Sequence, residues 1–120
     1  MSQQQHQLSI DLLESKIRYC GIKNTENLIA EYLQQLNMLL SRQHQNTDKF
    51  KVAERSAFVF FDTISDKTML QAWRLACVEG FTKCIELMNQ FCYSKCDSQK
   101  LRFMKLRLKV VEQSLQVKYE

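Results

Sequence analysis

The stretch from Thr68 to Cys92 constrains the fold more than any other part of this sequence. Its apolar residues recur every three or four positions, so they fall on one face of a helix of about seven turns. A long helix with one apolar face has to be covered by other segments. We therefore predict a central core helix over about residues 67–93. The large side chains expected at the centre of the core, or alternatively in an exposed groove for a partner helix, are Trp73, Phe81, Met88 and Phe91.

The scarcity of glycine and proline favours helices throughout the chain. There is no proline, and the two glycines are Gly21 and Gly80; long loops and all-β folds usually need more of both. A chain of 120 residues with 45% hydrophobic residues can bury the core of one domain. We predict an all-α, single-domain bundle of about five mostly antiparallel helices, with a flexible tail at 1–6 and the domain at 7–118. Gly80 permits a close helix approach within it.

Helical spacing of apolar side chains also places the other four helices. Polar residues that can accept backbone N–H groups mark their starts, and glycine marks one end. The predicted helices are Gln7–Cys20, ended by Gly21; a second from Asn24 or Thr25 to Leu40; Lys49–Ile64, capped by Thr47 or Asp48; and a last one capped by Asp97 or Ser98 that includes KLRFMKLRLKVVEQSL.

Two short segments also have features of β-strands. AFVFF, at 57–61, is β-branched and aromatic, and Lys105–Val110 alternates polar and apolar residues. Over longer windows both segments fit the helical period, so we predict helices at both. In the last helix the longer window contains two apolar rows. One row is Leu101, Met104, Leu108, Val111 and Leu115, and the other is Phe103, Leu106, Val110 and Val117.

The net charge of +4 comes entirely from the last segment. Residues 1–99 hold 11 Lys/Arg and 11 Asp/Glu, whereas residues 100–120 hold six Lys/Arg and two Asp/Glu. On a helix Arg102, Lys105 and Lys109 would line one strip, with Lys100 and Arg107 beside it, opposite the apolar rows. Such a face can bind nucleic acid phosphates or an acidic partner; the alternative is an ordinary solvated face. The candidate residues are Lys100, Arg102, Lys105, Arg107 and Lys109.

The sequence contains no recognisable catalytic, cofactor or metal site. Cys92 and Cys96 have a spacing that two metal ligands could use, but the histidines, His6 and His44, are isolated, and a tetrahedral zinc site needs four ligands. Five cysteines, an odd number, suggest reduced thiols rather than a disulfide framework. With no apparent signal peptide and no long apolar run, we expect a non-enzymatic intracellular protein, cytoplasmic or nuclear, without membrane partners.

Three segments between residues 29 and 92 share a pattern with one family. IAEYLQQLNMLL carries regularly spaced apolar residues, AERSAFVFFDT keeps Glu54 and Arg55, and EGFTKCIELMNQFC keeps Gly80, Phe81, Cys84 and Phe91. In this order they resemble the helix-loop-helix and Orange regions of Hairy and Enhancer-of-split repressors. The first segment matches through Ile29, Leu33, Leu36, Leu39 and Leu40. The family's basic region would precede Ile29, where the sequence is IKNTENL, so the resemblance implies dimerisation without direct DNA binding.

The second and third predicted helices are apolar over more than one row, which is more than a small core needs. Such a surplus is typical of a self-association or partner surface. We predict a helical protein–protein interaction module that forms homo- or heterodimers, or docks a helical partner, as a regulator or adaptor. The alternative is a nucleic-acid-associated protein that uses the basic last helix. The predicted partner-binding residues are Leu33, Leu36, Leu40, Phe58 and Phe61.

Overall fold

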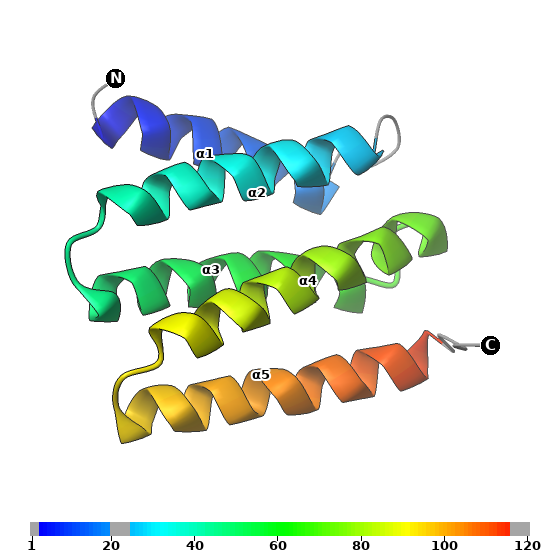
Figure 1. Ribbon diagram of the computed structural model, residues 1–120. Helices are drawn as coiled ribbons and strands as arrows, with labels where there is room; N and C mark the ends of the chain where they lie inside the picture. Colours follow the sequence, from blue (N-terminus) through cyan, green and yellow to red (C-terminus); the bar gives the residue numbers. More distant parts are fainter. Residues whose placement is uncertain (1–2, 20–24, 116–120) are drawn as a thin grey trace.

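The computed structural model describes residues 3–19 and 25–115, and within these ranges the regular structure is entirely α-helical (Figure 1). Consecutive helices run in opposite directions along the bundle, which confirms the predicted all-α, mostly antiparallel architecture. Both segments with strand-like features are helical, 57–61 in the third helix and 105–110 in the fifth. The helices are α1 (Gln3–Tyr19), α2 (Thr25–Arg42), α3 (Asn46–Ser65), α4 (Gln71–Phe91) and α5 (Lys95–Ser114).

The centre of the bundle is shared by α3 and α4, which lie between the α1–α2 pair and α5 (Figure 1). Helix α4 matches the predicted core helix, and it lies against α2, α3 and α5. Helix α3 lies against all four other helices. Of the side chains predicted at the core, Trp73, Phe81 and Met88 are completely buried, and Phe91 is half-buried.

A single glycine brings α3 and α4 together. A Cβ atom at Gly80 would collide with the ring of Phe60 on α3, and that ring is itself completely buried. Because the ring is buried on all sides, a side chain at Gly80 would force Phe60 or one of the two helices to shift. The predicted close helix approach at Gly80 is confirmed.

A turn shortens α4 relative to its predicted start at residue 67. The carboxylate of Asp66 accepts hydrogen bonds from the backbone N–H and the hydroxyl of Thr68, at 3.0 and 2.5 Å. Such local hydrogen bonds compete with helical geometry, and α4 begins only at Gln71. Arg18 of α1 lies 3.4 Å from the other oxygen of Asp66. The hydrogen bonds from Thr68, followed by Arg18, lower the pKa of Asp66.

Other boundaries also differ from prediction. Helix α1 begins at Gln3, so the predicted tail is helical from its third residue, and Gly21 lies outside the described residues. Helix α3 begins one turn earlier than predicted, after Gln45. Helix α5 is capped by Ser94 instead of Asp97 or Ser98. Residues 116–118 of the predicted domain lie outside the described part.

The N-terminal cap of α5 consists of two reciprocal hydrogen bonds. The hydroxyl of Ser94 accepts a hydrogen bond from the backbone N–H of Asp97 at 3.0 Å, and the Asp97 carboxylate accepts from the backbone N–H of Ser94 at 3.4 Å. This capping box satisfies backbone donors that have no partner within the helix. The predicted cap lies three residues too late because Asp97, which is part of the box, has the residue type of a cap itself.

A buried polar network joins α1, α2 and α3. The hydroxyl of Tyr32, which is completely buried, donates to Glu14 at 2.7 Å and lies 2.9 Å from the hydroxyl of Ser56. Arg55 donates to the second oxygen of Glu14 at 2.8 Å and to Asp11 at 2.8 Å. Burial, followed by the negative charge of Glu14, raises the pKa of Tyr32. Glu14 is thus buried, and both of its carboxylate oxygens accept hydrogen bonds, as buried charged groups require.

Candidate partner-binding surface

Helix α5 is apolar on two opposite faces. One face packs into the core through Leu101, Met104, Val111 and Leu115, all buried. The opposite face exposes Phe103, Leu106 and Val110, with 61%, 51% and 62% of each residue accessible to solvent. We call these three residues the outer row. They are spaced three and four residues apart, so they form one continuous apolar stripe on the helix.

The predicted basic residues border the outer row on both sides. At 100° per residue, Arg102 and Lys109 fall along one edge of the row, with Lys105 beyond them, and all three are exposed. Lys100 and Arg107 fall along the other edge, next to α3. We predicted Lys100 and Arg107 directly beside the strip formed by the other three, opposite both apolar rows. In the structure the outer row lies between the two groups, because it faces solvent instead of the core.

Arg107 links α5 to two residues predicted to bind a partner. Its guanidinium lies 5.2 Å from the ring centre of Phe58 and 5.4 Å from that of Phe61, both on α3. A cation over an aromatic ring in this range is worth about 0.5–1 kcal/mol at an exposed site. About two turns earlier on α5, Lys100 lies 3.9 Å from Glu54 of α3. The edge of the outer row next to α3 is therefore held in place by contacts with that helix.

The structure does not bring the five predicted partner-binding residues together. Phe58, 37% exposed, and Phe61, half-buried, lie on α3 beside α5. Leu33 is half-buried on α2, a helix that does not contact α5. Leu36 and Leu40 are 0% and 4% exposed in the core, so in the folded chain they cannot reach a partner.

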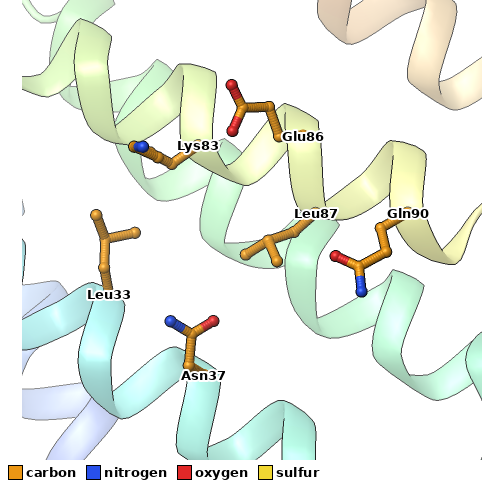
Figure 2. A pocket seen from close by; sticks show the side chains of 6 residues that line it. All are labelled: Leu33, Asn37, Lys83, Glu86, Leu87 and Gln90. Carbon is orange, nitrogen blue, oxygen red and sulfur yellow. The ribbon is translucent and has the colours of Figure 1, made fainter.

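Leu33 lines an open pocket between α2 and α4, with a volume of about 340 Å³. Figure 2 shows Leu33 and Asn37 on α2 facing Leu87 and Gln90 on α4 across this space. Lys83 and Glu86 complete the lining. Small-molecule sites are usually enclosed and mostly apolar. This pocket is open, and four of its six lining residues are polar or charged, which does not favour a ligand site.

Two of the described thiols, Cys77 and Cys84, are poorly suited to nucleophilic chemistry. Cys77 and Cys84 are buried in α4; burial raises the pKa of Cys77 to about 12 and raises the pKa of Cys84 as well. A thiol is reactive as the thiolate, so these two groups are unreactive near neutral pH. Cys96 is exposed and Cys92 half-buried. Among the described residues, no group of three or more His, Cys, Asp or Glu side chains could hold a metal ion.

None of the outer-row residues is among the predicted partner-binding residues. These three residues belong to the second predicted apolar row of the last helix, but a sequence cannot show which of two rows faces the core.

Comparison with protein-family models, curated proteins and solved structures finds no match to this chain. None of the helices in the described part is long and apolar enough to cross a membrane.

Proposed function

We propose that this protein is a non-enzymatic helical interaction module that docks a helical partner and acts as a regulator or adaptor. The observation that carries the proposal is the outer row of α5, three large apolar side chains exposed on the face opposite the buried one. Contiguous exposed apolar residues rimmed by polar ones typically mark interaction sites. The half-exposed Phe58 extends the apolar surface from α5 toward α3.

The location of this surface differs from the one that the family resemblance implies. The resemblance to Hairy-type repressors would place dimerisation on α2 and α3. Of the residues that carry its first segment, Ile29, Leu36, Leu39 and Leu40 are buried in the chain's own core. Contacts through these four residues would require the bundle to open, whereas contacts through the outer row of α5 would not. We therefore base the proposal on α5.

Binding of nucleic acid through the basic residues of α5 is the second candidate. The exposed Arg102, Lys105 and Lys109 support it, because clustered cations attract phosphates. The outer row argues against it, since phosphates would neutralise the cations and leave three apolar side chains in water. A protein partner can satisfy both sets of residues.

Affinity capture from cells with two matched variants tests the proposal. Leu106→Ser removes the centre of the outer row, and Leu12→Ser changes an equally exposed leucine on α1, 58% against 51% exposed; α1 does not contact α5. We expect a specific protein to be retained by the wild-type chain and by Leu12→Ser, and lost with Leu106→Ser. Retention of the same proteins by all three would contradict the proposal.

Fluorescence anisotropy with labelled DNA and RNA oligonucleotides tests the second candidate. We expect no binding even at about 20 mM salt, where phosphate contacts are strongest. Binding that weakens steeply with salt and is unaffected by Leu106→Ser would favour the nucleic-acid function over the interaction module.

A further inference from the structure

The outer row has the spacing of a coiled-coil contact. Phe103, Leu106 and Val110 occupy positions a, d and a of a heptad, and residues at a and d are the ones that insert into a partner helix. The preceding and following d positions are polar, Gln99 and Gln113. The apolar contact is therefore short, and the polar residues mark its two ends.

Every charged residue at the heptad edges is basic. Arg102 and Lys109 occupy g positions, and Lys100 and Arg107 occupy e positions. Residues at e and g lie beside the facing helix, where their charges determine which partners pair. The structure places these side chains on the two edges of the outer row, with Lys100 and Arg107 oriented by Glu54, Phe58 and Phe61 of α3.

A second copy of this chain does not fit the outer row. In a parallel pair the e residues of one helix face the g residues of the other, and in an antiparallel pair e faces e and g faces g. With these four edge residues basic, both orientations bring like charges together, which is unfavourable. A helix with acidic residues at its own e and g positions would instead form favourable ion pairs on both edges.

We infer that the outer row docks one amphipathic helix of another protein, with apolar residues at positions a and d and Asp or Glu at positions e and g. This inference rests on the proposed function and specifies the class of partner. Phe58, beside Arg107, adds an aromatic contact on the α3 side. The docked helix covers the apolar residues and neutralises the cations without opening the bundle.

Synthetic helices provide the probe. The first is a labelled peptide of about 21 residues, three heptads, with Leu and Ile at a and d and Glu at e and g. The second has Lys in place of Glu, and the third keeps Glu but has Ser at a and d. Anisotropy titrations with the full chain should show binding of the first peptide, roughly tenfold or more above the other two, and weakening between about 50 and 300 mM salt.

A charge reversal gives the more specific test. In the double variant Arg102→Glu/Lys109→Glu the g edge becomes acidic, and we expect the preference for the Glu peptide over the Lys peptide to fall by roughly tenfold or more. Leu106→Ser should weaken binding of the Glu peptide by a similar factor, and Leu12→Ser should not change it. Circular dichroism checks that each variant keeps its helical content, which we expect because all the changed side chains are exposed.

The outcomes separate this inference from the proposed function. If captured proteins depend on Leu106 but the peptides bind without charge preference, the inference fails and the proposed function stands. If neither the capture of proteins nor the binding of the Glu peptide depends on Leu106, the inference and the proposed function both fail. Light scattering that shows a dimer lost in Leu106→Ser would identify a second copy as the occupant and overturn the inference.

Discussion

Helices α3 and α5 have a similar pattern of apolar residues but differ in how many helices surround them. Each carries two apolar rows and several charged residues. Helix α3 has four neighbouring helices, and even Ser56 and Thr63 on it are buried. Within the described residues, helix α5 has two neighbouring helices, so one of its rows is buried and the other faces solvent. The comparison shows that position in the bundle, more than apolar content, decides which residues stabilise the fold and which remain available for binding.

The same substitution in the two helices should give the largest contrast. Phe60→Ala in α3 removes a completely buried ring and should cost about 3–5 kcal/mol of unfolding free energy. Phe103→Ala in α5 removes an exposed ring and should change it by less than about 0.5 kcal/mol. Urea unfolding followed by circular dichroism measures both. A comparable loss for Phe103→Ala would mean that another molecule already covers the outer row.

The polar contacts of α3 should also contribute to stability. Glu14→Leu leaves the Tyr32 hydroxyl and Arg55 without their shared carboxylate and should cost about 1–3 kcal/mol, because the remaining polar groups lose a partner at a buried site. Glu31→Leu, at an exposed position on α2, serves as the control and should change stability by less than about 0.5 kcal/mol. Equal effects of the two substitutions would show that the network contributes no net stability.

A methyl group at Gly80 tests how tightly α3 is held. Gly80→Ala should gain about 1 kcal/mol of helix propensity but lose about 1–3 kcal/mol through collision with Phe60, so we expect a net loss on thermal unfolding. The loss should be smaller when Phe60→Leu is already present, because the shorter side chain leaves room for the methyl group. Stabilisation by Gly80→Ala alone would show that α3 and α4 can separate at low cost.

The start of α5 should be sensitive to its cap. Ser94→Ala removes the hydroxyl that accepts from Asp97 and should cost about 1 kcal/mol, with faster amide hydrogen exchange in the first turn of α5. Ser114→Ala, at the last residue of the same helix, is the matched control and should have little effect. If exchange in the first turn is unchanged, packing on α3 and α4 alone holds that end of α5.

The contrast between buried and exposed positions should also appear in the reactivity of the thiols, which can be measured without any substitution. Cys96 on α5 is exposed, and Cys77 and Cys84 on α4 are buried with raised pKa values. Near pH 8 an alkylating reagent should modify Cys96 in the folded chain, and the two buried thiols only in denaturant. Site-resolved mass spectrometry distinguishes them. Early modification of Cys84 would indicate that α4 opens readily.

The sequence predicts helices well and their surroundings poorly. Helical spacing located the helices, and the longer windows correctly outweighed the strand-like features of 57–61 and 105–110. The network around Glu14 was missed because its members are far apart in the sequence and meet only after folding. The exposure of Phe103 and the burial of Leu36 depend in the same way on which helices become neighbours.

The contact between Trp73 and α1 gives the chain an internal optical reporter. The chain has one tryptophan; it is 1% exposed, and its indole N–H donates to the carbonyl oxygen of Ile17 at 2.8 Å. Tryptophan fluorescence therefore comes from one known place, where the Trp73 side chain at the start of α4 reaches the end of α1. Detachment of α1 would shift that emission toward the wavelength of a hydrated indole, whereas occupation of the distant outer row would leave the spectrum unchanged.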